Sequence, residues 1–409
     1  MLTRRVLLCA ASLAPLAAAA RAAEPKRHAG HAAKAGPTPA EPMTPASTPV
    51  GPVDTAARWA VINDFNTGAT ILEKDADARM PPSSMTKIMT AYIVYGMLKA
   101  GRLKLDQTLP VSEKAWRMGG SKMFVQIGTQ VNVEDLIRGM IVQSGNDACI
   151  VLAEGVAGSE EQFADLMNKK AKELGLTNSH FVNATGWPAD DHYTSARDLA
   201  ILSAAIIRDF PEYYKYDSER SFTYGAAADG KPITQENRNP LVQKGLADGL
   251  KTGHTDAGGF GLCVSAIRNG RRIVMVLNGM TSMHQRAEES ERLLEWAYRE
   301  FEDVTLFAAG DTVESVPVWL GTAPTVPLVG GRDLVVTMPR NWRNKAKVAV
   351  SYESPIRAPV QRGSKLGELV VTGDGVPNLS IPLLGGADVP RLGLPGRAIA
   401  VLSHYVAGG

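Results

Sequence analysis

A serine and a lysine three residues apart, Ser84 and Lys87, are the first residues in the chain that could do chemistry together. They follow Pro81-Pro82 at a predicted helix start, so their side chains share one side of the first turn. The residues around them recur at the spacing of a buried helical face: Met85, Ile88, Met89 and Tyr92. A serine hydroxyl is a weak nucleophile until a base takes its proton, and a partly buried lysine can be that base.

Two more short motifs follow. Ser144-Gly145-Asn146 comes after a predicted helix over 133–143, in a tight loop where a serine can relay a proton and an amide can bind substrate. Lys251-Thr252-Gly253-His254 opens a predicted strand and brings a cation, a hydroxyl and a glycine that lets a ligand approach the backbone. Alone, the first motif is equally typical of a helix cap, the second of a turn, and the third of an edge strand whose lysine prevents aggregation. Together, in helix, loop and strand contexts, they favour a site built on a serine nucleophile.

The elements that must position these motifs begin and end with strands. Residues 58–73 predict a hairpin with its turn at Asn66-Thr67-Gly68, and residues 249–280 predict strands with a hairpin turn at Asn269-Gly270. A helix over 282–303 closes the region, and its expected buried face carries Leu293, Leu294, Ala297 and Phe301.

Several helices are predicted between these strands, from Pro81 to Phe210. One begins at a capping box on Ser159 and ends at Gly175. The class is therefore α+β: an α/β sheet covered by helices, with a helical subdomain inserted between its edges.

The domain boundaries follow from shifts in composition. Residues 1–22, with Arg4-Arg5 before a short apolar run, predict a secretory signal, and the Pro- and Ala-rich residues 23–53 predict a flexible linker. The domain that carries the motifs is expected over 54–303. A small C-terminal all-β domain is predicted over 304–390 from short β-rich pieces separated by Gly and Pro, at 313–320, 334–338, 346–352, 366–372 and 379–384.

The tail, residues 391–409, leaves two interpretations open. Ile399, Leu402 and Val406 would share one apolar stripe on a helix, which would be a weak peripheral membrane anchor. A frayed tail is the other interpretation.

Composition excludes some classes of function. The 44 Lys and Arg residues balance 42 Asp and Glu residues without a long basic run, so a nucleic-acid partner is not expected. After removal of the signal, Cys149 and Cys263 remain, far from any His cluster or CxxC pattern. No metal or other cofactor is therefore predicted, and whether these two cysteines pair stays open.

The three motifs together resemble the serine penicillin-recognising enzymes, with a β-lactamase/transpeptidase-like fold. Longer segments are similar to the D-alanyl-D-alanine carboxypeptidases, the low-molecular-mass penicillin-binding proteins: PPSSMTKIMTAY, QSGNDAC, GLKTGHTDAGG and MTSMHQRAEESERLLEWAYREFE. The resemblance covers residues 55–303, and the β-rich region fits the family's C-terminal domain in kind. It implies an exported hydrolase, in the periplasm or on the outer face of the cytoplasmic membrane, that acts on peptidoglycan stem peptides and is acylated by β-lactams.

The resemblance also implies roles for residues. Ser84 is the acylated nucleophile, Lys87 its general base, and Ser144 and Asn146 form the second motif. Lys251, Thr252, Gly253 and His254 form the substrate-binding strand, and the backbone N–H groups of Ser84 and His254 form the oxyanion hole.

Three further residues are expected to support these roles. Arg286 falls where the family places an arginine near the substrate carboxylate. Asp209 and Arg238 lie in family-like segments and are expected to orient His254 or brace the cleft. Some relatives carry a histidine just before the glycine of a later loop, whereas Thr185 precedes Gly186 here.

Three other functions are weighed against carboxypeptidase activity. A DD-endopeptidase is hard to separate by sequence. A β-lactamase of class A needs a deacylating Glu in an ExxLN segment, and the nearest approach, starting at Glu173, lacks the Asn. A non-catalytic wall-binding protein would not need the intact Ser84, Lys87 and Ser144.

Overall fold

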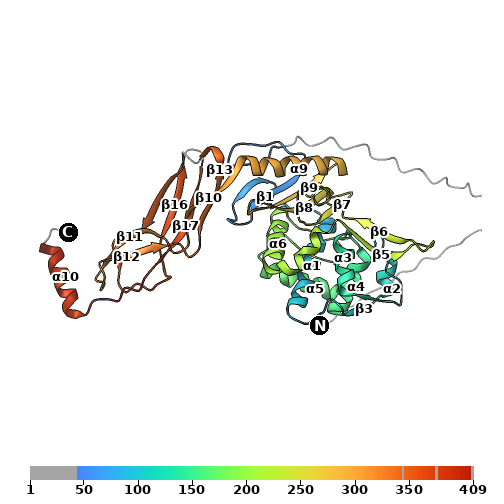
Figure 1. The fold of residues 1–409 in the computed structure, drawn as a ribbon, viewed down its shortest axis with the longest axis horizontal. Coiled ribbons are helices and arrows are strands. Elements are labelled where there is room, and N and C mark those ends of the chain that lie inside the picture. Colours follow the sequence, from blue (N-terminus) through green and yellow to red (C-terminus); the bar gives the residue numbers. More distant parts are fainter. Residues whose placement is uncertain (1–43, 343–344, 374–375, 407–409) are drawn as a thin grey trace, which may run out of the picture. The chain divides into compact units, whose positions relative to one another are not determined.

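The computed structural model describes residues 44–342, 345–373 and 376–406 (Figure 1). The predicted signal, 1–22, and most of the predicted linker lie outside the described residues. In the described part of the chain, no helix combines the length and the apolar character needed to cross a bilayer.

An antiparallel five-stranded sheet forms the centre of the first domain, in the order β2-β1-β9-β8-β7. Its strands are β1 (Trp59–Asp64), β2 (Thr70–Lys74), β7 (Thr252–Thr255), β8 (Gly259–Arg268) and β9 (Arg271–Met280). Both predicted hairpins are confirmed. Asn269 and Gly270 have φ values of 50° and 80°, the left-handed pair that a tight two-residue hairpin turn requires.

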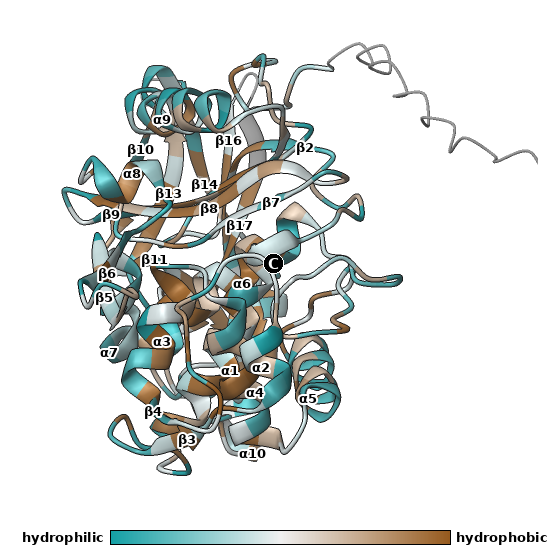
Figure 2. Cartoon of the chain, turned by 90° about the vertical axis from the view of Figure 1, so that its right-hand side faces the viewer, coloured by the Kyte–Doolittle hydropathy of each residue, from teal (hydrophilic) through white to brown (hydrophobic). Residues whose placement is uncertain are grey.

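The sheet is buried on both faces, because alternate residues of its strands enter two separate cores. Val61, Val274 and Val276 pack against the helical subdomain, with α6 (Ala196–Asp209) on this face. Ile62, Met275 and Leu277 pack instead under α9 (Met283–Glu300). In Figure 2 the central strands are brown whereas α9 is mainly teal, as expected for a helix that covers a sheet with its outer face in water.

The inserted subdomain contains the predicted helices and two small hairpins. Its helices are η1 (Ser83–Thr86), α1 (Lys87–Lys99), α2 (Glu113–Arg117), α3 (Val133–Ile141), α4 (Asn146–Ala157), α5 (Glu160–Glu173), α6, α7 (Pro211–Tyr214), η2 (Lys215–Ser218) and α8 (Pro240–Gln243). Its strands are β3 (Thr108–Pro110), β4 (Gln130–Asn132), β5 (Ser221–Ala226) and β6 (Pro232–Glu236). The predicted cap of α5 is confirmed, since Ser159 Oγ accepts from the Gln162 N–H and Gly175 follows with φ of 74°.

The C-terminal region is all-β, as predicted. It contains β10 (Phe301–Phe307), β11 (Thr312–Trp319), β12 (Thr325–Val329), β13 (Leu334–Pro339), η3 (Arg340–Trp342), β14 (Lys347–Tyr352), β15 (Ile356–Arg357), β16 (Lys365–Gly373) and β17 (Val376–Gly385). These strands form a pair, β10-β13, and a six-stranded sheet, β14-β16-β17-β12-β11-β15. The sequence patterns missed β10, β12 and the two-residue β15. A final helix, α10 (Leu394–Val406), follows.

Two boundary predictions are wrong. The flexible linker was expected to reach residue 53, but Ala46 is fully buried and pairs with Val53. Ser47 exchanges two backbone hydrogen bonds with Glu73, because β2 is an edge strand with free backbone groups. The last helix was expected to reach residue 303, but α9 ends at Glu300. Phe301 is buried as predicted, but in the strand β10.

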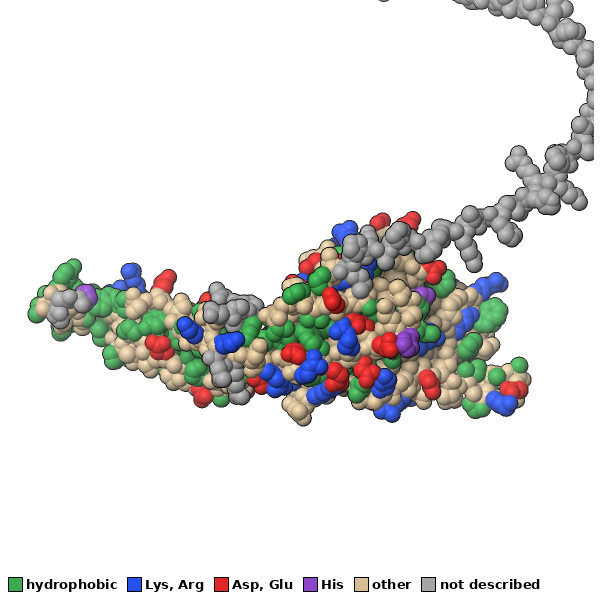
Figure 3. Space-filling model, turned by 90° about the horizontal axis from the view of Figure 1, so that it is seen from above, with side chains coloured by type: hydrophobic (Ala, Val, Ile, Leu, Met, Phe, Trp, Pro, Cys, Tyr) green, Lys and Arg blue, Asp and Glu red, His purple; other side chains and the backbone are tan. Residues whose placement is uncertain are grey.

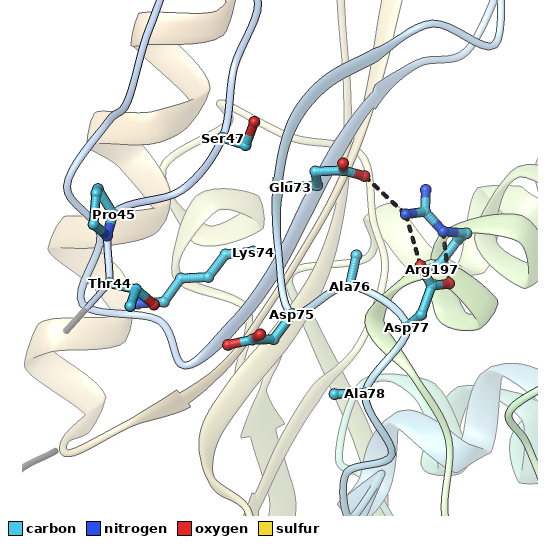
Figure 4. Close-up of a pocket in the computed structure, with 10 residues that line it drawn as sticks. All are labelled: Thr44, Pro45, Ser47, Glu73, Lys74, Asp75, Ala76, Asp77, Ala78 and Arg197. Atoms are coloured by element: carbon cyan, nitrogen blue, oxygen red, sulfur yellow. Dashed lines mark hydrogen bonds and ion pairs between the residues drawn. The ribbon is translucent and has the colours of Figure 1, made fainter. Parts of the chain in front are cut away.

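The segment that replaces the end of the expected linker borders a hollow of about 460 Å³. Figure 4 shows Thr44, Pro45 and Ser47 on one side of it and Arg197 on the other, where the guanidinium contacts Glu73 and Asp77. None of the sequence-predicted site residues lines this hollow.

Candidate active site

Ser84 and Lys87 lie next to each other at the junction of η1 and α1. The Lys87 side chain is 1% exposed, and its Nζ lies 2.8 Å from Ser84 Oγ. The same Nζ is 2.7 Å from Asn146 Oδ1 and 2.7 Å from the carbonyl oxygen of Thr185. Burial lowers the pKa of Lys87 to about 8, so a sizeable fraction is neutral just above neutral pH. A neutral lysine amine at this distance can take the serine proton.

The second motif lies at the N-terminus of α4. Asn146 is the first residue of that helix, and besides Lys87 it contacts the Gly119 carbonyl through Nδ2, at 2.9 Å. Ser144 is 2% exposed, has a left-handed φ of 60° and lines the same cavity as Ser84. The motif thus holds the Lys87 amine in place through Asn146 and presents a second hydroxyl through Ser144.

The third motif lies along β7, an edge strand that packs on η1. This approach requires Gly253, because a Cβ there would lie 2.9 Å from the Ser83 Cβ. Ser83 Oγ and Thr255 Oγ1 are 3.2 Å apart and join the two elements a second time. The close approach brings the Thr252–His254 backbone to the cavity that Ser84 lines.

Lys251 lies beneath this strand rather than in the cavity. It is 4% exposed, and its Nζ lies 3.4 Å from the Thr252 carbonyl oxygen. Burial, followed by the charge of nearby Lys87, holds its pKa well below the usual range. Lys251 therefore lines neither hollow at Ser84, and its amine lies against the backbone of the strand.

Two adjoining hollows meet at Ser84, Ser121 and His254. The first, of about 460 Å³, has these further lining residues: Ser144, Glu236, Asn237, Arg238, Thr252, Gly253, Phe260, Met283 and Arg286. The second, of about 290 Å³, has these: Gly120, Asn146, Thr185, Gly186, Trp187, Pro188, Thr255 and Asp256. A peptide with its reacting carbonyl at Ser84 would therefore have one side near two arginines and the other near Trp187.

The two arginines have no carboxylate partner within the described residues. Arg286 is 7% exposed, in the first turn of α9, and its Nε has no hydrogen-bond partner. Its terminal nitrogen donates to the Arg238 carbonyl at 3.3 Å, and Arg238 itself contacts Ser121. Burial and the charge of Arg238 lower the pKa of Arg286 to about 10. A buried cation such as Arg286, with the exposed Arg238 beside it, suits an anionic group supplied by a ligand.

The structure does not bring Asp209 to the cleft. Its carboxylate accepts from Tyr92 at 2.8 Å and from Arg208 at 2.9 Å, at the C-terminal end of α6. The expectation that Asp209 orients His254 or braces the cleft is therefore wrong, because its partners belong to α1 and α6. The His254 ring instead stacks on Phe260, with ring centres 3.9 Å apart.

Sequence reasoning missed several residues that build the site. Asp147 accepts from the backbone N–H groups of residues 123–125 and so fixes the loop after α2. Gly186 has a φ of 82°, and a Cβ there would lie 1.8 Å from the Ser83 carbonyl oxygen. This glycine was noted in the sequence, but its contact with η1 could not be read from it.

His192 was also missed, and it contacts η1, the turn that carries Ser84. Its Nδ1 accepts from the Val182 N–H at 3.1 Å, so Nε2 carries the proton toward Thr86 Oγ1, 3.0 Å away. Burial lowers the pKa of His192 to about 4, which keeps the ring neutral. It joins the loop around residue 182 to η1.

Glu173 was the nearest sequence candidate for a β-lactamase base, but the structure does not place it at the site. It ends α5, pairs with Lys170 on the surface and lines neither hollow at Ser84.

A serine hydrogen-bonded to a buried lysine lies beside an edge strand and two arginines that have no carboxylate partner in the part of the chain that the structure describes. These features define an enzyme of the serine penicillin-recognising class. The chain belongs to the D-alanyl-D-alanine carboxypeptidase family, whose model matches residues 44–281. A second model, the C-terminal domain of penicillin-binding protein 5, matches residues 301–391 and begins where β10 begins.

Individual relatives agree with this family. The D-alanyl-D-alanine carboxypeptidase DacC of Escherichia coli is 38% identical, covering 83% of this chain and 86% of the relative. The corresponding DacA of Haemophilus influenzae is 36% identical over 85% of this chain and 89% of its own length. Penicillin-binding protein 5 of H. influenzae is similar in structure, with a TM-score of 0.77 and 36% identity, and the match covers 83% of this chain and 99% of that protein. Penicillin-binding protein D2 of Listeria monocytogenes, solved in an ampicillin-bound form, has a TM-score of 0.53 at 28% identity. The match covers 59% of this chain and 97% of that protein.

Proposed function

We propose that Ser84 carries the D-alanyl-D-alanine carboxypeptidase activity of this family, through an acyl-enzyme formed with peptidoglycan stem peptides. Neutral Lys87 takes the Ser84 proton while Oγ attacks the carbonyl carbon of the penultimate D-Ala. The backbone N–H groups of Ser84 and His254 are the proposed donors to the oxyanion. When the C–N bond breaks, the proton passes to the leaving amine through Lys87 and Ser144, and D-Ala departs.

Deacylation repeats this chemistry with water. Lys87 takes a proton from the attacking water and returns it to Ser84 Oγ as the ester bond breaks, and the shortened peptide leaves with the water oxygen in its new carboxylate. A β-lactam acylates Ser84 in the same way, but its leaving amine stays attached to the acyl group. The adduct is therefore expected to persist.

The single observation that carries the proposal is the 2.8 Å contact between Ser84 Oγ and a Lys87 amine buried to 1% exposure. The test is release of free D-Ala by the purified protein from a peptide that ends in D-Ala-D-Ala. We expect one D-Ala per peptide, and no release after incubation with penicillin. Release that continues on fully acylated protein would contradict the proposal.

The two unpaired arginines favour a carboxypeptidase over an endopeptidase, because an endopeptidase substrate has an amide where the carboxylate would be. We expect Arg286→Ala to lower kcat/KM on the free peptide roughly ten- to a hundredfold, the effect of losing a charge-assisted hydrogen bond of about 1.5 to 3 kcal/mol. The amidated peptide should be nearly unaffected, since it has no charge for Arg286 to bind. Steady-state kinetics on the two peptides check this.

The matched control is Arg299→Ala, in the same helix but paired with Glu300 on the surface. It should change neither rate. Equal losses on both peptides in Arg286→Ala would show that this residue supports the cleft and does not recognise the carboxylate.

We further propose that the protein works outside the cytoplasmic membrane and that α10 contacts that membrane. The apolar stripe expected in the tail is on a helix, and Ile399, Leu402 and Val406 are 65%, 64% and 87% exposed. Figure 3 shows hydrophobic side chains over this helix. A short helix with one such stripe is a marginal interfacial anchor.

Deletion of residues 396–409 is expected to move the protein from the membrane fraction to the soluble fraction, because the buried apolar area on the bilayer is lost. Leu402→Asp should do the same, whereas Ala400→Asp adds the same charge off the stripe and should have less effect. Fractionation followed by detection of penicillin-labelled protein measures this. If the deletion variant distributes between the two fractions as the wild type does, the proposal that α10 is an anchor is wrong.

A further inference from the structure

We propose that Asn183 is a positioning residue, which holds the Thr185 carbonyl against Lys87 and so keeps the amine aimed at Ser84. The inference rests on the proposed function, in which Lys87 is the base. It concerns a residue that touches neither Ser84 nor either hollow.

Asn183 closes the turn that ends at Trp187 with a single side chain. Its Oδ1 accepts from the backbone N–H groups of Thr185, Gly186 and Trp187, at 3.1, 2.8 and 3.1 Å. The Thr185 hydroxyl donates to the same oxygen at 3.0 Å, and Asn183 Nδ2 donates to the Trp187 carbonyl at 2.9 Å. The N–H groups of Thr185 and Gly186 therefore have this amide oxygen as their acceptor, and the Trp187 N–H shares it with Thr185 Oγ1, at 3.1 Å.

The backbone just before this turn is held by other residues. The Ala184 carbonyl accepts from Thr90 Oγ1 at 2.7 Å, and the Ala184 N–H donates to Glu160 at 3.1 Å. Loss of Asn183 would leave these two bonds in place. The part that would be released is the tip, residues 185–187, which includes the carbonyl that Lys87 contacts at 2.7 Å.

Release of that carbonyl has two opposite effects on Lys87. The carbonyl stabilises the ammonium form against burial, so without it the proton leaves more readily. The amine is also held less firmly toward Ser84, so proton transfer becomes slower. The other charged or titratable groups near Lys87 are Asp147, Cys149, Arg238 and Lys251, and all remain in the variant.

The experiment measures the rate constant for acylation by penicillin across pH in the full chain. We expect Asn183→Ala to move the acid limb of the profile to lower pH and to lower the plateau roughly tenfold. Asn183→Asp keeps an acceptor for the three N–H groups, so it should recover most of the plateau without lowering the acid limb.

Asn168→Ala is the matched control. Asn168 also uses both ends of its amide on the backbone, contacting the Phe181 carbonyl at 2.7 Å and the Phe181 N–H at 2.8 Å. It does not contact residues 185–187, so this variant should lose thermal stability and keep the wild-type pH profile.

The proposal is overturned if Asn183→Ala acylates with the wild-type profile, or if Asn168→Ala moves the profile equally. Should the alanine variant fail to fold, Asn183→Ser carries the same test, because its shorter side chain cannot reach all three N–H groups. A wild-type protein that penicillin does not acylate would instead contradict the proposed function itself.

Discussion

Ser84→Ala is expected to lose all covalent labelling by penicillin and to release D-Ala roughly 10⁴- to 10⁶-fold more slowly, as when the nucleophile of a serine hydrolase is removed. The reason is that the cavity and the arginines can still bind the peptide, but the hydroxyl that Lys87 contacts, and that would form the acyl bond, is gone. Mass spectrometry of the intact protein after incubation with penicillin measures the adduct, and peptide mapping locates it.

The adjacent serine gives the control for this prediction. Ser83 lies in the same 3₁₀ turn and is 2% exposed, but its Oγ faces Thr255 rather than Lys87. Ser83→Ala should still carry one adduct, on Ser84. An adduct that forms on Ser84→Ala would show that another residue is the nucleophile.

Lys87→Met is expected to slow acylation by roughly 10² to 10⁴-fold, because a thioether cannot take the serine proton. In the wild type, acylation should rise with pH through about 8, since the fraction of neutral Lys87 rises as its ammonium loses a proton. Stopped-flow or quenched acylation across pH measures both effects, and the limb near pH 8 should be absent in Lys87→Met.

Lys99→Met is the matched control, in the same helix but with its amine on the Asp209 carbonyl at the surface. It should acylate with the wild-type profile. A wild-type rate that is flat from pH 6 to 9, or that falls as pH rises through 8, would contradict the assignment of Lys87 as the base.

The motifs and the elements that carry them could be predicted because both depend on local physics. Helix caps such as Ser159, turn pairs such as Asn269-Gly270 and the apolar spacing after Ser84 act over a few residues. The serine and the lysine are also close in sequence, and one helical turn is enough to bring Ser84 and Lys87 together.

The C-terminal strands were predicted less completely. The apolar pieces of β11, β13 and β16 are long enough to show a pattern, whereas β15 has only two residues. The sequence pattern predicts helix at the start of β10, because Phe301 continues the apolar spacing of α9. Burial was predicted correctly there, but the change from helix to strand depends on pairing with β13, more than thirty residues away in the chain.

Sequence alone predicted the nucleophile and the base and determined the order of the three motifs, because those depend on residue type and short spacing. Only the tertiary structure decided what surrounds the Lys87 amine. The Thr185 carbonyl that contacts it and the Asn183 amide that holds this carbonyl belong to a loop about a hundred residues further along the chain. The tertiary structure also decided the place of Asp209. Its family-like segment predicted a residue of the cleft, but its carboxylate accepts a hydrogen bond from Tyr92 instead. A backbone carbonyl has the same chemistry in every residue, so its role is set only by where the fold places it.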